Sequence, residues 1–127
     1  MNHSDLRICI LAAGKGTRMN SDLPKVLHKI NNKTLLEFVI ETSESLNPTE
    51  IILIVGYKKE VVIKSVNKFN LSLAYQNKQK GTAHAIMQCK EHLQNKSGKT
   101  LILSGDVPLI SKNTLKNEFH PFLNLRY

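Results

Sequence analysis

The sequence predicts an α/β protein in which helices cover both faces of a parallel sheet. Apolar runs of strand length alternate with segments that repeat their apolar residues at helical spacing, in the order βαβαβαβ. These runs are continuously apolar, as expected for strands buried on both faces, and no internal repeat, low-complexity segment or linker interrupts the order. Parallel strands joined in this way require right-handed crossovers, which place helices on both sides of the sheet.

The first half of the chain predicts two strands around one helix. Residues 6–11 are apolar apart from Arg7 and end at a glycine-containing loop, so we expect the first buried strand there. Thr34-Leu35-Leu36-Glu37 has the spacing of a capping box, and Pro48 ends the helical pattern that follows. The apolar face of this helix is expected to comprise Leu35, Leu36, Val39, Ile40 and Leu46. Residues 50–56 predict the second strand.

The middle of the chain predicts a helix over residues 58–69 and a short third strand over residues 71–75. The helix carries many β-branched residues, which are weak helix formers. The residues expected on its buried face are Val61, Val62, Val66 and Phe69.

The last third predicts a helix over residues 81–93, with Thr82 as its N-cap and Ile86, Cys89 and Leu93 as its buried stripe. Residues 100–104 predict the fourth strand, and Thr114-Leu115 are expected in a last short helix.

Composition indicates one soluble domain with an ordinary core. The chain has 127 residues, of which 41% are hydrophobic and 22% charged, and no apolar run approaches the length of about 20 residues that spans a bilayer. Residues 1–5 lack the pattern of an export signal, so we expect a cytoplasmic protein without a membrane partner. Cys9 and Cys89 lie too far apart for a metal knuckle or a redox pair, and buried free thiols are expected.

The net charge of +8 does not by itself indicate a nucleic-acid partner. The excess is mainly lysine scattered along the chain, whereas base recognition depends on arginine and single-strand binding on aromatic residues beside the basic groups. Aromatic residues make up only 6% of the chain, so no nucleic acid is expected as partner.

The loop after the first strand has the composition of a phosphate-binding loop. Gly14 and Gly16 let the backbone turn its N–H groups toward an anion, while Lys15, Arg18 and Lys25 add positive charge. The spacing excludes the nucleoside-triphosphatase P-loop and the dinucleotide fingerprint. An ordinary turn, with Lys25 as a surface lysine, is the alternative.

Two later loops are expected at the same edge, because the loops that follow parallel strands meet at one edge of the sheet. Asp106 follows the fourth strand, and a carboxylate together with triphosphate oxygens commonly holds Mg²⁺, although a turn-forming aspartate before Pro108 is the alternative. Residues 76–85 offer amide and hydroxyl groups, which suit a base pocket and an ordinary helix cap equally well. His84 has no partner at ligand spacing and is expected to be a surface or packed histidine.

Four segments together resemble one family. Gly-x-Gly-Thr-Arg-Met followed by Pro-Lys is typical of sugar nucleotidyltransferases, and residues 11–19, 23–28, 76–85 and 104–110 together are similar to the uridylyltransferase domain of the bacterial bifunctional enzymes that make UDP-N-acetylglucosamine, a peptidoglycan precursor. The resemblance implies a three-layer, Rossmann-like parallel sheet of the nucleotidyltransferase type. We expect residues 1–115 to form its N-terminal nucleotide-binding half, residues 116–127 to form a divergent C-terminal tail, and the chain to be truncated relative to the family.

The resemblance also implies a reaction, namely transfer of uridylyl from UTP to N-acetylglucosamine 1-phosphate with release of pyrophosphate and with Mg²⁺ as cofactor. Arg18 and Lys25 would stabilise the triphosphate, Gln76, Gly81 and Thr82 would contact uracil, and Asp106 would bind Mg²⁺. The full set assigned to the nucleotide is Leu11, Ala12, Ala13, Gly14, Lys25, Gln76, Gly81, Thr82, Ser104 and Gly105. A nucleotide-binding protein without turnover and a transferase for another base are the alternatives, and the oligomeric state stays open.

Overall fold

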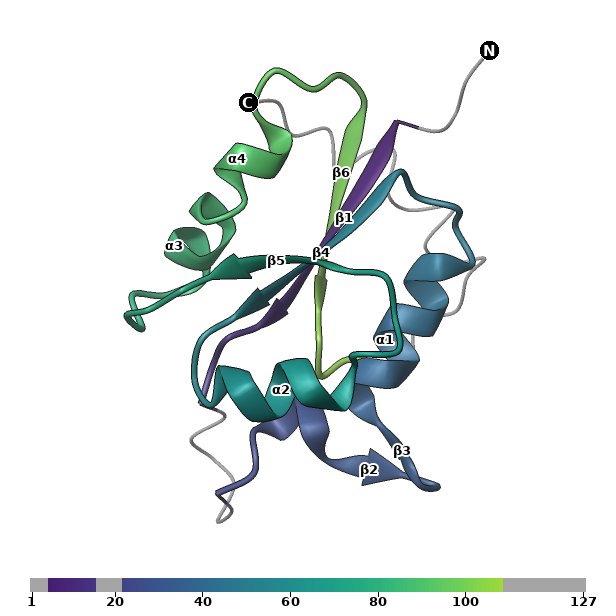
Figure 1. Cartoon of the computed structure of the whole chain (residues 1–127), viewed down its shortest axis with the longest axis vertical. Coiled ribbons are helices and arrows are strands. Elements are labelled where there is room, and N and C mark those ends of the chain that lie inside the picture. Colours follow the sequence, from purple (N-terminus) through teal and green to yellow (C-terminus); the bar gives the residue numbers. More distant parts are fainter. Residues whose placement is uncertain (1–4, 16–21, 109–127) are drawn as a thin grey trace.

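The computed structural model describes residues 5–15 and 22–108 and contains the expected parallel sheet. Its strands are β1 (Leu6–Ala12), β4 (Glu50–Val55), β5 (Ser72–Tyr75) and β6 (Lys99–Ser104), paired in the order β5-β4-β1-β6. Each neighbouring pair is parallel. The chain therefore builds outward from β1 to β5 and then returns to the opposite side of β1 as β6, so strand order reverses at β1 (Figure 1).

Helices lie on both faces of this sheet, as predicted (Figure 1). On one face, α1 (Leu35–Glu44) and α2 (Lys59–Ser65) cover a large apolar cluster that includes Ile8, Ile10, Leu36, Ile40 and Val62. On the other face, α3 (Thr82–Met87) and α4 (Lys90–Leu93) cover a smaller cluster that includes Cys9, Ile52, Ile54, Ala85 and Leu93. Successive strand residues thus enter opposite clusters, which explains why Ile8–Ala12 of β1 and Ile51–Val55 of β4 are apolar at every position.

The predicted capping box is present at the start of α1. The Thr34 hydroxyl accepts a hydrogen bond of 3.0 Å from the Glu37 backbone N–H, and the Thr34 backbone N–H donates to the Glu37 carboxylate at 3.3 Å. Thr34 also ends a two-stranded hairpin, β2 (Lys29–Ile30) and β3 (Lys33–Thr34), that the sequence analysis did not predict. Asn31 and Asn32 have positive φ angles of 54° and 70°, as a tight hairpin turn requires.

The predicted helix over residues 58–69 is shorter than expected and faces the core differently. It ends at Ser65, because Val66 adopts a φ of −123° that leaves the helical region. Val66 and Val62 are buried, whereas Val61 is 48% exposed, so the prediction that Val61 faces the core was wrong. The β-branched residues at this end favour a turn that directs Val66 into the core over a continued helix.

The predicted helix over residues 81–93 is divided into α3 and α4. Cys89, with ψ near 0°, separates them, and the buried stripe comprises Ala85, Cys89 and Leu93 rather than Ile86. The N-cap is Gly81, which makes no side-chain cap hydrogen bond, so the prediction of Thr82 as N-cap was wrong. The predicted helix at Thr114-Leu115 lies outside the described residues.

The two cysteines are free and buried, as expected, but they are neighbours in space. A hydrogen bond with Cys89 and burial raise the pKa of the Cys9 thiol far above its ordinary value. The pair packs between β1 and the junction of α3 with α4, where neutral thiols behave as small apolar side chains. In the part of the chain that the structure describes, no helix has the length and apolar character to cross a membrane.

Glu50 connects four elements at the end of the sheet where β4 begins. Its carboxylate accepts a hydrogen bond of 2.6 Å from the Ser72 hydroxyl of β5 and lies 3.0 Å from His92 Nδ1 of α4 and 3.5 Å from Arg7 Nε of β1. Burial alone would raise the pKa of Glu50, but these partners outweigh it and lower the pKa below its ordinary value. The ionised carboxylate therefore stabilises the fold.

We expect Glu50→Gln to lower the free energy of unfolding at neutral pH by about 1–3 kcal/mol, because the Ser72 hydroxyl loses a charged acceptor and Arg7 loses the opposite charge of its ion pair. A carboxyl with a lowered native pKa stabilises the protein above the unfolded pKa, about 4.3 for glutamate, and loses this effect as pH falls through the native pKa. Urea unfolding at a series of pH values should therefore show the wild-type and variant curves converging below about pH 4.

Glu60→Gln is the matched control for this series. Glu60 lies exposed in the first turn of α2, and its replacement should change the free energy of unfolding by less than about 0.5 kcal/mol at any pH. A constant difference between the wild type and Glu50→Gln, independent of pH, would contradict the assigned role of the Glu50 carboxylate.

Candidate functional site

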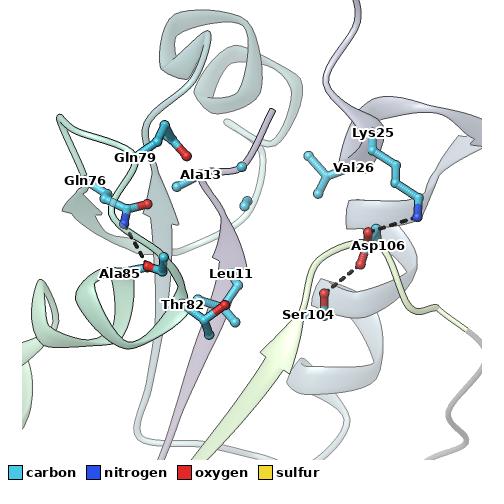
Figure 2. Close-up of a pocket in the computed structure, with 13 residues that line it drawn as sticks. Leu11, Ala13, Lys25, Val26, Gln76, Gln79, Thr82, Ala85, Ser104 and Asp106 are labelled. Atoms are coloured by element: carbon cyan, nitrogen blue, oxygen red, sulfur yellow. Dashed lines mark hydrogen bonds and ion pairs between the residues drawn. The ribbon is translucent and has the colours of Figure 1, made fainter. Parts of the chain in front are cut away.

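A cavity of about 270 Å³ lies beyond the carboxyl ends of β1, β5 and β6, where strand order reverses (Figure 2). Open α/β sheets commonly bind ligands at this place. Residues from segments far apart in the sequence line the cavity: Leu11, Ala12, Ala13, Gly14, Lys25, Val26, Gln76, Gln79, Gly81, Thr82, Ala85, Ser104 and Asp106.

The end of β1 forms the middle of the cavity, between a charged side and an amide side (Figure 2). Ala12 and Ala13 are buried, with exposed fractions of 2% and 3%, and their small side chains leave the space above them open. The Ala13 carbonyl accepts a hydrogen bond of 3.1 Å from the Tyr57 backbone N–H, which fixes the start of the loop. Lys15 is not part of the cavity lining, and its amine lies 5.8 Å from the Tyr57 ring centroid.

The charged side comprises Lys25, Ser104 and Asp106. Lys25 Nζ lies 3.3 Å from Asp106 Oδ2, and the Ser104 hydroxyl donates a hydrogen bond of 2.6 Å to Asp106 Oδ1 (Figure 2). Partial burial alone would raise the pKa of Asp106, but the hydrogen bond from Ser104 and the ion pair with Lys25 lower it below its ordinary value. The carboxylate is therefore ionised at neutral pH and retains the charge that a divalent cation requires.

Local structure explains how Lys25 reaches this position. It begins a short 3-10 helix, η1 (Lys25–Leu27), that follows the buried Pro24. The Leu27 backbone N–H donates to the Pro24 carbonyl at 2.9 Å, and Val26 and Leu27 are buried. The helix is thus held by its apolar residues, while the Lys25 side chain stays 48% exposed at the cavity.

The amide side comprises Gln76, Gln79, Gly81 and Thr82. Gln76 is only 3% exposed, and its Nε2 donates a hydrogen bond of 3.0 Å to the Gly81 carbonyl. Gly81 has a φ of 95° and a ψ of 175°, a conformation that is accessible to glycine and strained for other residues. This conformation turns its carbonyl toward Gln76 and starts α3 directly behind it.

The structure brings together most of the residues predicted for the site. Ten of them line the cavity: Leu11, Ala12, Ala13, Gly14, Lys25, Gln76, Gly81, Thr82, Ser104 and Asp106. Arg18 lies outside the described residues. Gly105 does not line the cavity, because it is buried beneath it, where its N–H donates to the Leu11 carbonyl at 2.9 Å. The chemical roles of all these residues stay predictions.

Sequence analysis missed four residues that shape the cavity. Val26, Gln79 and Ala85 line it. The only signal for them in the sequence is that they lie within the segments 23–28 and 76–85, which resemble the family. Gly56 is the fourth, since a Cβ there would lie 2.5 Å from the Gln76 carbonyl and 3.1 Å from Gln79 Nε2. No local pattern marks Gly56, because the close approach arises only when β4 and β5 are paired.

The sequence matches one protein-family model and is similar to known proteins. Residues 8–123 match the family model described as "MobA-like NTP transferase domain". The chain is 45% identical over 113 residues to a bifunctional protein GlmU of Streptococcus agalactiae, covering 87% of this chain and 24% of the relative. It is 48% identical over 112 residues to a GlmU of Francisella tularensis subsp. novicida, covering 88% of this chain and 24% of the relative. The chain therefore spans about a quarter of the length of these relatives.

Solved structures share the fold. A Methanothermobacter nucleotidyl transferase superposes with a TM-score of 0.75 at 20% identity, over 88% of this chain and 55% of that one. The CTP:phosphocholine cytidylyltransferase LicC of Streptococcus pneumoniae superposes with a TM-score of 0.69 at 28% identity, over 85% of this chain and 50% of that one. Rv0371c of Mycobacterium tuberculosis, solved in complex with manganese, superposes with a TM-score of 0.74 at 17% identity, over 91% of this chain and 58% of that one.

We expect Gly105→Ala to lower the free energy of unfolding by about 1–3 kcal/mol, because the crowded backbone beneath the cavity leaves no room for a methyl group. A Cβ at this position would lie 2.8 Å from the Leu11 carbonyl and 3.1 Å from Val26 Cγ1. Gly14→Ala is the control, since no atom lies within 4 Å of a Cβ placed there. Thermal unfolding of both variants tests this, and equal melting temperatures would contradict it.

Proposed function

The chain belongs to the family of MobA-like NTP transferase domains, and we propose that its cavity binds UTP together with Mg²⁺ for transfer of uridylyl to N-acetylglucosamine 1-phosphate. The observation that carries this proposal is the joining of an ionised carboxylate, a lysine and a buried amide in one cavity at the reversal of strand order. Similarity to the GlmU proteins supports the choice of base and sugar. Since UTP is an intracellular nucleotide, we expect the protein in the cytoplasm.

The charged side suits the triphosphate. In the proposed reaction a phosphate oxygen of the sugar phosphate attacks the α-phosphorus of UTP, a new P–O bond forms, and the bond to pyrophosphate breaks. This displacement needs no nucleophile from the protein, only correct positioning and positive charge beside the phosphate oxygens. Lys25 supplies such a charge at the cavity, and because its side chain is half-exposed the amine can contact a phosphate.

The donor set at the charged side fits Mg²⁺. Asp106 offers an ionised, partly exposed carboxylate, and the described residues include no group of three or more His, Cys, Asp or Glu that could enclose a metal. A cation held by Asp106 would therefore take its other ligands from water and phosphate oxygens, as Mg²⁺ commonly does in nucleotide sites. When bound, Mg²⁺ neutralises charge on the triphosphate.

The amide side suits the nucleobase. Gln76 is held by its hydrogen bond to the Gly81 carbonyl and carries a polar amide, and Gln79 and Thr82 add polar groups around it. At the middle of the cavity, the small residues Ala12 and Ala13 allow a flat ligand to approach the backbone of β1 closely. We therefore propose that uracil binds here, with its triphosphate extending toward Lys25.

Nucleotide binding without turnover is a second candidate function. The cavity accounts for the proposed contacts of a nucleotide, whereas in the described part of the chain we assign no residue to the acceptor sugar. Such a protein would bind UTP through the same residues and release no pyrophosphate.

Pyrophosphate release from UTP, Mg²⁺ and N-acetylglucosamine 1-phosphate separates the two candidates. We expect release by the wild-type protein and its decrease by about 100- to 1,000-fold in Lys25→Ala, because a charge that stabilises the reacting phosphate is lost. Asp106→Asn should cause a similar decrease and weaken Mg²⁺-dependent UTP binding measured by calorimetry. Lys64→Ala removes an exposed lysine on α2 and is the control for net charge.

The outcomes are distinct. UTP binding without pyrophosphate release would favour the second candidate. Unchanged UTP binding in both Lys25→Ala and Asp106→Asn would contradict the assignment of the cavity to the nucleotide.

A further inference from the structure

His84, on α3, contacts the buried amide of Gln76 behind the cavity wall. Its Nδ1 lies 3.0 Å from Gln76 Nε2, and His84 itself does not line the cavity. The same amide nitrogen donates to the Gly81 carbonyl at 3.0 Å. Both hydrogens of the Gln76 amide are therefore directed to partners on the α3 side.

The orientation of the Gln76 amide follows from these partners. A backbone carbonyl oxygen can only accept a hydrogen bond, so the Gln76 atom beside the Gly81 carbonyl must be the nitrogen. The amide oxygen is consequently turned away from α3, and Figure 2 shows it directed toward the middle of the cavity, where Ala13 lies. Gln76 thus presents an acceptor, and not a donor, to a ligand.

This arrangement also determines the tautomer of His84. A neutral imidazole has one acceptor nitrogen, and two amide nitrogens compete for it: Gln76 Nε2 at 3.0 Å from Nδ1 and Gln88 Nε2 at 3.3 Å from Nε2. Each amide nitrogen also donates to one backbone carbonyl, but Gln76 is 3% exposed whereas Gln88 is partly exposed, so an N–H left unpaired costs more free energy at Gln76 than at Gln88. Nδ1 is therefore the acceptor, and the proton resides on Nε2.

We propose that His84 is a positioning residue for base selection: by accepting from Gln76 at Nδ1, it holds the Gln76 carbonyl oxygen toward the cavity, so that the site prefers a pyrimidine with a ring N–H, uracil, over cytosine. Uracil offers N3–H to this acceptor, whereas cytosine presents an unprotonated N3, whose lone pair repels it. The inference rests on the proposed function, because it concerns the base of the nucleotide that the cavity is proposed to bind.

Without His84 the amide of Gln76 loses one of the two acceptors that fix it. The free-energy cost of rotating the Gln76 amide, so that its nitrogen faces the cavity, is then smaller. In this rotated orientation the amide offers a donor to N3 of cytosine. The expected effect of removing Nδ1 is consequently a change in the preference between two bases, rather than a uniform loss of affinity.

Calorimetric titration of UTP and CTP tests the inference. We expect the wild-type preference for UTP over CTP to fall by at least about tenfold in His84→Leu, which keeps side-chain bulk and removes the acceptor. His84→Asn should retain the preference, because Oδ1 of asparagine can accept at the place of Nδ1. Gln88→Ala is the matched control, since Gln88 contacts the same ring at its other nitrogen.

Inorganic tripolyphosphate provides a probe without a base. Its affinity should be equal in the wild type and His84→Leu, because the charged side is separate from the Gln76 contact. A parallel loss of tripolyphosphate binding, or an unchanged UTP preference in His84→Leu, would overturn the positioning role. A wild-type protein that binds no UTP would instead contradict the proposed function itself.

The tautomer gives a test that needs no substitution. A long-range ¹H–¹⁵N spectrum of the wild-type protein, at a pH where imidazoles are neutral, should show His84 protonated at Nε2. Protonation at Nδ1 would overturn the inference, even if the His84→Leu variant failed to fold.

Discussion

Parallel pairing of β1 with β4 on one side and with β6 on the other is the constraint on which the rest of the structure depends. Because the strands are parallel, their carboxyl ends all lie at one edge of the sheet. Because β4 and β5 lie on one side of β1 and β6 on the other, the order of the strands reverses at β1. The reversal separates the loop after β6 from the loop after β5, and the cavity lies between them. Gly105 allows this edge to close tightly, since its N–H bonds directly to the carbonyl of Leu11.

How far the sequence predicts this structure depends on the kind of information that each feature requires. The four strands of the parallel sheet were predicted because an apolar run is a local signal of burial, whereas the short strands β2 and β3 have no such run. The capping box at Thr34 was predicted because its contacts span three residues. Val61 and Thr82 were mispredicted because tertiary packing, which directs Val66 and Ala85 into the core, decided the ends and the faces of those helices. Gly56 and the contact of His84 with Gln76 have no local signal, since both depend on which strands become neighbours.

The two sides of the cavity are stabilised by different physical means. At the charged side the Lys25 side chain is 48% exposed, so the ion pair with Asp106 is screened by solvent and contributes little to stability. Lys25 and Asp106 can therefore separate at a low cost in free energy and pair with the charges of a ligand instead. At the amide side, Gln76 is 3% exposed, and its hydrogen bonds cannot be replaced by water without opening the wall formed with α3.

This difference suits the two tasks of a nucleotide site. Charged phosphates are bound by long-range attraction, which tolerates side chains that move and are partly solvated. Discrimination between uracil, which has a hydrogen on N3, and cytosine, which has none there and carries an amine in place of O4, requires a polar atom whose identity is fixed before the ligand arrives, because a freely rotating amide would accept from one base and donate to the other. The burial of Gln76 against Gly81 and His84 provides this fixed orientation, and the exposed Lys25 beside Asp106 provides the adaptable charge.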